Sequence, residues 1–502
     1  MKSTGTLLDL FQRTAHAHTA IIIPDHDLKV SYESLRDQTW EMAQMLAGAG
    51  ICRNARVAIA LPNGLPAIVS FLAAAIAGTA APLNPAYRHD EFDFFLEDTG
   101  ARVLICPPVG AEEARRAAAD RAIPVLTAEI ESHGRVHLRG THSKGTVTAP
   151  SPKDVALILH TSGSTGRPKR VPLQHVNLLV SAQNIAHTYL LSQEDVSLCI
   201  MPLFHVHGLV ASTLATLMTG GTVVIPKKFE ALSFWRMVKE YKVTWYSGVP
   251  TMHQVLLARA GSHGKPPGAE SLRFIRSCST PLSAEVMHHM EEVFGVPLLE
   301  AYGMTEAAHQ MCSNPLPPRV HKPGSVGVPC GMQISIMNSH GLHVGIDKRG
   351  EVVIRGANLF PGYENDAEAN ASAFRDGWFR TGDEGLLDHD GYLHLTGRLK
   401  EQINRAGEKI SPREIDKVLL KHPAVSEAVT FGYAHPTLNE EVAAAVVLRE
   451  PVSEAALLKF CGERLADFKC PKKLFILDNI PQTATGKIRR KEVSAALVEG
   501  KK

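Results

Sequence analysis

The sequence lacks the patterns that mark several large classes of protein. Its eight cysteines are scattered and include no C-x-x-C pair, so we expect free thiols in a reducing compartment and neither a disulfide framework nor a zinc site. One H-x-x-x-H pair, His133 and His137, lies in a polar stretch without helical character, with Gly134 where a zinc protease needs Glu. A net charge of +2 indicates no nucleic-acid-binding surface.

The sequence also has little that would take it into or across a membrane. The N-terminus lacks the apolar core of a signal peptide. The most hydrophobic run, from Ala67 to Ala81, is rich in alanine and falls short of a bilayer span, so we interpret it as a buried helix. The last residues, Glu499 to Lys502, differ from an S-K-L-type peroxisomal signal. We therefore predict a cytoplasmic protein without a membrane span.

A chain of 502 residues, 44% hydrophobic and 21% charged, has ordinary globular composition but is too long for one core. Short apolar runs alternate with helix-length segments through the first 300 residues, which is typical of stacked parallel βα sheets. After about His321 the runs shorten and are broken by Gly and Asp-Gly, which favours an antiparallel or barrel-like unit. Ser411 to Glu414 has the pattern of a capping box at a helix start.

These patterns predict an α/β protein with two domains. The large N-terminal domain, residues 1–398, contains stacked βα sheets and, over residues 321–398, the smaller β-rich unit. The small α+β C-terminal domain spans residues 399–502.

The segment from Thr161 to Lys169, T-S-G-S-T-G-R-P-K, follows an apolar run, Val155 to Leu159, that predicts a buried strand. Its glycines let backbone N–H groups approach a ligand, its hydroxyls can donate, and its two cations can offset negative charge, so the segment suits a polyphosphate. It is not a Walker A loop, because the residue five after Gly163 is Pro168. Taken alone, it could also be a surface turn.

Four further motifs follow in order along the chain. They are Tyr302-Gly303-Met304-Thr305-Glu306, Phe379-Arg380-Thr381-Gly382-Asp383, Gly397-Arg398-Leu399-Lys400-Glu401 and Thr485-Gly486-Lys487. Together with the hydroxyl-rich segment, they make the chain closely resemble the adenylate-forming superfamily of acyl-CoA synthetases, adenylation domains and luciferases, over essentially its whole length. One departure is Arg170, where relatives usually have Gly after the loop lysine.

Within that superfamily, the chain most resembles the oxalate–CoA ligases. The stretches that carry this resemblance are Pro202 to Gly208, Phe274 to Ser279, Met304 to His309 and Ser313 to Pro317. The resemblance implies two half-reactions. A carboxylate attacks the α-phosphorus of ATP to give an acyl-adenylate and pyrophosphate, and a CoA thiolate then displaces AMP.

The resemblance also implies roles for individual residues toward ATP. The loop would hold the β- and γ-phosphates through Thr161, Ser162, Gly163, Ser164, Thr165, Gly166 and Lys169. Tyr302 and Gly303 would meet the adenine, Asp383 would bind the ribose hydroxyls, and Arg398 would reach the ribose or phosphates. Thr305 would donate to the α-phosphate, and Glu306 would hold Mg²⁺, an ion that prefers oxygen ligands.

The C-terminal domain of this superfamily rotates between the half-reactions. Lys487 resembles the catalytic lysine, whose ammonium would bridge the attacking carboxylate and the α-phosphate and so reduce their repulsion. Lys400 lies at the hinge position. The rotation would replace Lys487 by a loop in which Gly407 and Glu408 meet CoA.

Four polar residues are candidates for the acid pocket, namely His207, Ser277, Ser279 and His309. Fatty-acid and aromatic-acid relatives need a long apolar pocket, whereas hydroxyls and imidazoles can partner a second carboxylate. Such a site should reject monoacids, because its polar groups would stay unpaired. Each of the four taken singly could be a core residue. His205 occurs widely in the superfamily and says little about the substrate.

Alternatives remain open from the sequence. The acid could be malonate, a short- or medium-chain fatty acid or an aryl acid. The chain could also load a carrier protein in trans, or it could be a catalytically silent nucleotide-binding protein. Luciferase-like oxygenation is possible by fold but has no support in the residues. The partners we expect are therefore small molecules: ATP, CoA and a carboxylic acid.

Overall fold

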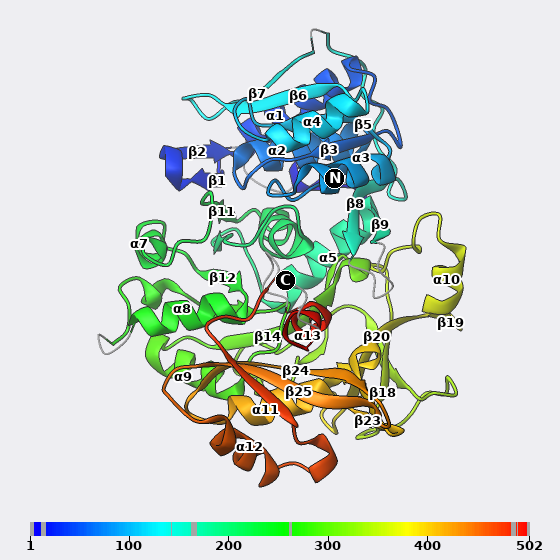
Figure 1. Ribbon diagram of the computed structural model, residues 1–502. Coiled ribbons are helices and arrows are strands. Elements are labelled where there is room, and N and C mark those ends of the chain that lie inside the picture. The colour runs from blue at the N-terminus through cyan, green and yellow to red at the C-terminus, as the bar shows by residue number, and fades with distance from the viewer. Residues whose placement is uncertain are drawn as a thin grey trace.

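The computed structural model describes residues 5–11, 17–141, 143–161, 168–260, 264–482, 488 and 490–498. Four sheets with flanking helices make up this part of the chain, and they confirm the predicted fold class of stacked βα sheets, a small β-rich unit and an α+β C-terminal region. Figure 1 shows the first sheet at the opposite end of the molecule from helices α11 (Pro412–Leu420) and α12 (Glu454–Gly462). No helix in the described part of the chain has both the length and the apolar character needed to cross a bilayer.

The first sheet has seven strands in the order β7-β6-β5-β3-β4-β8-β9, parallel in the centre and antiparallel at both ends. Its strands are β3 (Arg56–Ile59), β4 (Thr79–Pro82), β5 (Ala101–Cys106), β6 (Val125–Ile130), β7 (Val136–Arg139), β8 (Val155–Thr161) and β9 (Lys169–Gln174). Its helices are α1 (Tyr32–Gly48), α2 (Leu65–Ala77), α3 (His89–Thr99) and α4 (Glu112–Asp120).

Helix α2 is the buried alanine-rich helix predicted for Ala67 to Ala81, but its predicted end is wrong. The helix stops at Ala77, and the last residues of the run form β4 instead. Gly78 follows the last helical residue in a non-helical conformation, and only glycine fits there, because a Cβ would lie 2.4 Å from the carbonyl oxygen of Ala55. The chain thus turns directly from the helix into the sheet core.

The second sheet has nine strands in the order β16-β15-β14-β13-β12-β10-β11-β1-β2, parallel from β1 to β14. Its strands are β1 (Thr19–Ile23), β2 (Leu28–Ser31), β10 (Val196–Leu198), β11 (Thr222–Val224), β12 (Trp245–Gly248), β13 (Phe274–Ser277), β14 (Leu298–Met304), β15 (His309–Ser313) and β16 (Val328–Pro329). The helices in this region are α5 (His175–Thr188), α6 (Ala215–Met218), α7 (Phe234–Glu240), α8 (Pro250–Ala260) and α9 (Ala284–Phe294). Polar residues gather where β12, β13 and β14 end, the edge at which parallel sheets bind ligands.

The third sheet is antiparallel, in the order β17-β18-β20-β19, with β21 also paired to β20. Its elements are β17 (Gln333–Met337), β18 (Gly350–Arg355), α10 (Ala367–Ala373), β19 (Phe374–Arg375), β20 (Trp378–Leu387) and β21 (Leu393–Arg398). The register pairs Asp383 on β20 with Arg398 on β21, so two predicted nucleotide-binding residues become direct neighbours.

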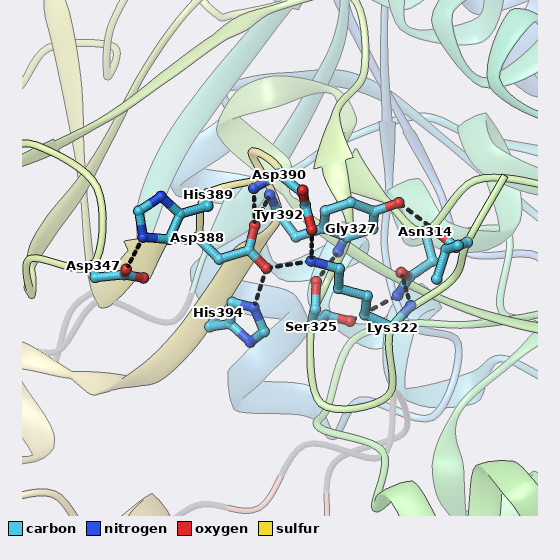
Figure 2. A network of polar contacts seen from close by, with 11 residues as sticks. Asn314, Lys322, Ser325, Gly327, Asp347, Asp388, His389, Asp390, Tyr392 and His394 are labelled. Carbon is cyan, nitrogen blue, oxygen red and sulfur yellow. Dashed lines mark hydrogen bonds and ion pairs between the residues drawn. The ribbon is translucent and has the colours of Figure 1, made fainter.

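A polar network anchors the turn between β20 and β21 (Figure 2). The Lys322 ammonium lies 2.8 Å from a carboxylate oxygen of Asp388 and 2.6 Å from one of Asp390. The second oxygen of Asp388 accepts from the backbone N–H of Tyr392, and Asn314 accepts from the backbone N–H of Lys322. These bonds tie the turn to the segment that follows β15, so the strands carrying Asp383 and Arg398 are fixed relative to the nine-stranded sheet.

The C-terminal region contains a five-stranded sheet, order β23-β22-β25-β24, with β26 paired in parallel to β25. Its elements are β22 (Ile403–Arg405), β23 (Glu408–Ile410), α11 (Pro412–Leu420), β24 (Val425–His435), β25 (Asn439–Leu448), α12 (Glu454–Gly462), β26 (Lys473–Leu477) and α13 (Arg490–Val498). Two apolar clusters in this region are built entirely from residues after position 402. The exact domain boundary at residues 398–399 stays a prediction.

Helix α11 begins at Pro412 as predicted, but the predicted capping box does not form. The Ser411 hydroxyl donates to the carbonyl of Thr396 at 2.6 Å instead of accepting from the helix. The Glu414 carboxylate meets the ammonium of Lys469 at 2.8 Å. Proline at the first helical position therefore starts the helix, and the serine joins it to β21.

Candidate active site

A tight hairpin carries predicted residues for both ATP and the acid. Strand β14 runs through Tyr302, a single 3₁₀ turn spans Thr305–Ala307, and β15 begins at His309. Glycine is required at position 303, because a Cβ there would lie 2.2 Å from the carbonyl oxygen of His309. The hairpin therefore brings Tyr302, Thr305, Glu306 and His309 together.

The hairpin turn holds strained backbone. His309 has φ of 113° and Ala308 has φ of 50°, values that non-glycine residues rarely adopt. The Ser181 hydroxyl donates to the Ala308 carbonyl at 2.8 Å, and the Asn358 amide donates to the Ala307 carbonyl at 2.9 Å. Such strain persists only where the surroundings enforce it, and it is concentrated at functional sites.

Three predicted nucleotide-binding residues form one polar cluster. The Tyr302 hydroxyl donates to one carboxylate oxygen of Asp383, and Nε of Arg398 lies 2.8 Å from the other oxygen. Tyr302 and Asp383 are buried, whereas the Arg398 side chain is half-exposed. Burial, together with the Asp383 carboxylate, raises the pKa of the Tyr302 phenol well above 10, so this side chain stays a hydrogen-bond donor.

Glu306 lies buried beside the start of β9. The Tyr363 hydroxyl donates to Oε1 of Glu306 at 2.8 Å, and the Lys169 ammonium lies 4.6 Å from the centre of the Tyr363 ring. Tyr363 is in turn fixed by Asn370, whose amide makes two hydrogen bonds with the Tyr363 backbone. One tyrosine thus joins the lysine at the end of the hydroxyl-rich segment to the carboxylate predicted to hold Mg²⁺.

The ends of the hydroxyl-rich segment are paired. Strands β8 and β9 are antiparallel, with Thr161 opposite Lys169, so the predicted strand before the segment is confirmed and a second strand follows it. Ser162, Gly163, Ser164, Thr165 and Gly166 lie outside the described residues, as does Lys487. Their roles stay predictions.

A fully buried arginine lies at the centre of the predicted acid pocket. Arg276 on β13 has 0% exposure, and no carboxylate among the described residues pairs with it. Its guanidinium donates to the Ser247 hydroxyl at 2.9 Å, to the side-chain oxygen Oε1 of Gln310 at 3.0 Å and to the Tyr189 hydroxyl at 2.9 Å. A buried charge normally has a counter-ion, whereas the partners of this guanidinium are all neutral.

Two histidines complete this buried cluster. Nη1 of Arg276 faces Nε2 of His207 at 3.4 Å, and Nη2 faces Nδ1 of His309 at 3.3 Å. A guanidinium only donates, so both of these ring nitrogens are acceptors and each ring carries its proton on the other nitrogen. His207 then donates from Nδ1 to the Ser279 hydroxyl at 3.0 Å. Nε2–H of His309 has no partner among the described residues.

Burial lowers the pKa of His207 and of His309 well below 6.5, and the charge of Arg276 lowers both further. Both rings are therefore neutral at neutral pH, and the cluster carries the single positive charge of the guanidinium. The imidazole centroids lie 5.2 Å apart. The arrangement can present a buried cation and imidazole N–H groups to a small anion. The cation fixes the tautomer of each imidazole ring.

The other candidates lie as follows. Ser279 joins the cluster, with φ of 77°. Side chains alternate along β13, which places Ser277 on the face opposite Arg276, and its hydroxyl has no partner among the described residues.

Lys400 lies in a 3₁₀ turn after β21, and Gly407, with φ of 94°, lies between β22 and β23 beside exposed Glu408. The roles of these residues stay predictions.

Sequence reasoning missed four residues of the cluster, which are Arg276, Ser247, Gln310 and Tyr189. A charged residue inside the apolar run Phe274 to Ser277 was an available signal, because arginine is rarely buried without a role. Its three neutral partners come from distant positions in the chain, and only the fold brings them together.

Among the described residues, no group of three or more His, Cys, Asp or Glu side chains is placed to hold a metal ion. Glu306 provides one buried carboxylate. Mg²⁺ that arrives with a nucleotide needs only one or two protein carboxylates, because phosphates and water supply the other ligands, so this residue fits such an ion.

The fold and these clusters define an adenylate-forming enzyme, and comparisons with known proteins agree. Residues 10–364 match the AMP-binding enzyme family, and residues 414–487 match the AMP-binding enzyme C-terminal domain. ATP-bound MatB from Rhodopseudomonas palustris superposes with a TM-score of 0.90 at 29% identity, covering 98% of this chain and 99% of that one.

Three curated relatives are similar over nearly the full length. An oxalate–CoA ligase of Arabidopsis thaliana is 46% identical over 91% of each chain. An oxalate–CoA ligase of Saccharomyces cerevisiae is 40% identical over 98% of each chain. A probable CoA ligase of Humulus lupulus is 45% identical over 98% of this chain and 97% of the relative. The chain belongs to the AMP-binding enzyme family and is an AMP-forming acid–CoA ligase.

Proposed function

We propose that the chain ligates oxalate to CoA through an oxalyl-adenylate, releasing AMP and pyrophosphate. The observation that carries this proposal is the buried guanidinium of Arg276, which has only neutral partners. The relatives that bear the name oxalate–CoA ligase, at 46% and 40% identity, favour oxalate over other small diacids.

The pocket chemistry supports a small acid with a second negative charge. Burying an unpaired carboxylate costs several kcal/mol, on the order of what a nearby buried cation returns. Arg276 supplies that charge, while Nε2–H of His309 and the His207–Ser279 pair supply hydrogen bonds. A monoacid would leave these polar groups unpaired, so the pocket selects against acetate and against fatty acids.

In the adenylation step, the chain positions ATP and reduces charge repulsion. Asp383, buried beside Tyr302 and Arg398, would bind the ribose hydroxyls. Glu306 would hold Mg²⁺, which neutralises phosphate oxygens, and Thr305 on the same turn would donate to the α-phosphate. Lys487 would bridge the attacking carboxylate and the α-phosphate.

In the thioester step, the C-terminal domain would turn at Lys400 and bring Gly407 and Glu408 to CoA. Gly407 has no atom within 4 Å of where a Cβ would lie, and it follows Arg405, whose guanidinium is held by Glu441 at 2.7 Å. A hairpin braced in this way can move as a unit.

A panel of acids tests the substrate. ATP–pyrophosphate exchange should be fastest with oxalate when it is compared with malonate, acetate, octanoate and 4-coumarate, and the CoA thioester identified by mass should be oxalyl-CoA. A faster rate with octanoate or 4-coumarate would contradict oxalate while leaving the ligase class intact. Release of AMP with CoA as the only acceptor would argue against loading of a carrier protein.

A further inference from the structure

A second polar cluster lies beneath the paired ends of the hydroxyl-rich segment. Nη1 of Arg170, the second residue of β9, donates to the Asp98 carbonyl at 2.5 Å and lies 3.4 Å from Oε2 of Glu364. Nε of Arg170 lies 3.4 Å from the Asp98 carboxylate, which also meets His160 at 3.0 Å. Arg56 on β3 pairs with the other oxygen of Glu364 at 2.5 Å.

The charges in this cluster balance. Two guanidiniums face two carboxylates, and none of the four side chains is more than 24% exposed. Burial lowers the pKa of His160, so this ring adds no charge at neutral pH. Partly buried pairs of this kind are screened less than surface pairs, and removing one partner leaves the other charge uncompensated.

Arg170 also takes part in the contact between β9 and the segment of Tyr363 and Glu364, and Tyr363 bonds Glu306. Lys169 lies over the Tyr363 ring, and the next residue, Arg170, faces Glu364. The backbone N–H of Glu364 donates to the Arg170 carbonyl at 3.2 Å, which fixes the register of the two segments. Tyr363 then donates to Glu306.

We propose that Arg170 is a positioning residue for the adenylation step. Through Glu364 it sets where the Tyr363 hydroxyl meets Glu306, and through Asp98 it ties the start of β9 to helix α3. It thereby aligns Lys169 with the carboxylate that holds Mg²⁺, and this inference rests on the proposed role of Glu306.

Arg170→Met tests the proposal, because it keeps most of the side-chain length and removes the guanidinium. ATP–pyrophosphate exchange is measured with the best acid of the panel. The variant should require about tenfold more Mg²⁺·ATP for half-maximal rate, because loss of a residue that positions a metal ligand weakens metal binding on this scale. The KM for the acid should stay within about twofold, and Arg170→Lys should recover most of the loss. A merely structural role would lower the melting temperature and the active fraction, without moving the KM for Mg²⁺·ATP.

Two further variants make the result specific. Arg121→Met removes a guanidinium that also meets helix α3, at Asp93 2.5 Å away, but that bonds neither Glu364 nor β9 among the described residues, so it should leave the KM for Mg²⁺·ATP within about twofold. Tyr363→Phe should raise the Mg²⁺ requirement about tenfold by itself. An unchanged KM in both Arg170 variants overturns the inference. If Tyr363→Phe is also unchanged, the role of Glu306 fails with it; if Tyr363→Phe shifts alone, only the inference about Arg170 fails.

Discussion

Replacing Arg276 with methionine removes the charge that we assign to the second carboxylate of the acid. The guanidinium is fully buried and meets the pocket through the His309 ring, whose Nδ1 lies 3.3 Å from Nη2. A carboxylate bonded to the other nitrogen of that ring lies about 8 Å from the guanidinium, because the ring and the two hydrogen bonds add. At an effective dielectric constant of about 20, two unit charges at that separation interact by about 2 kcal/mol. The loss should therefore lower kcat/KM for oxalate about 30-fold.

The assay compares two acids in one protein. Acetate has no second carboxylate, so its kcat/KM should change by less than about threefold in Arg276→Met, and the oxalate-to-acetate ratio should fall about 30-fold. A ratio is insensitive to the fraction of folded enzyme, which matters because the variant leaves the Ser247 hydroxyl without a donor and removes one donor from Gln310. A ratio within threefold of the wild-type value would refute the assignment.

Arg273→Met provides a matched control. Arg273 lies just before β13, but its guanidinium pairs with Asp195 at 2.6 Å, meets the pocket cluster only at the backbone carbonyl of Tyr189, 3.2 Å away, and is partly exposed. The same chemical change there should alter the melting temperature and leave the ratio of the two acids unchanged.

Two further predictions concern the lysine and the pH dependence. Lys487→Ala should slow ATP–pyrophosphate exchange about 10²–10³-fold. Thioester formation from supplied oxalyl-adenylate should change much less. Equal losses in both steps would contradict a role confined to adenylation. The pKa values of His207 and His309 are depressed in the folded state, so the unfolded chain binds more protons below pH 6.5. The free energy of unfolding should therefore fall as the pH drops from 6.5, by up to about 1.4 kcal/mol per pH unit for each ring. His309→Gln should weaken this dependence, measured as the melting temperature between pH 7.5 and 5, and an unchanged slope would show that the folded ring is not held neutral.

Local sequence patterns predicted the parts of the fold that local chemistry determines. The apolar run before Thr161 is a buried strand, proline at position 412 starts a helix, and the Gly-broken runs after His321 form the antiparallel sheet. The errors occurred where a distant part of the chain decides the outcome. Helix α2 ends before Gly78, where the Ala55 carbonyl leaves no room for a Cβ, and Ser411 turns to Thr396 instead of capping its own helix.

The acid pocket shows the same division. His207 and His309 could be proposed from the resemblance. The role of Arg276 could not, because it depends on neutral partners at positions 189, 247 and 310 that only the fold brings together. Nothing local in the sequence states that this guanidinium lacks a carboxylate. By contrast, the separation of Ser277 from Arg276 follows from the strand itself, because successive side chains of a strand point to opposite faces.

The most direct measurement is a crystal structure of the chain with a non-hydrolysable oxalyl-adenylate analogue. The account predicts that the free carboxylate accepts a hydrogen bond from Nε2 of His309 and lies about 8 Å from the Arg276 guanidinium, with the sugar hydroxyls on Asp383. A free carboxylate turned to solvent, with no contact to His207, His309 or Arg276, would contradict it.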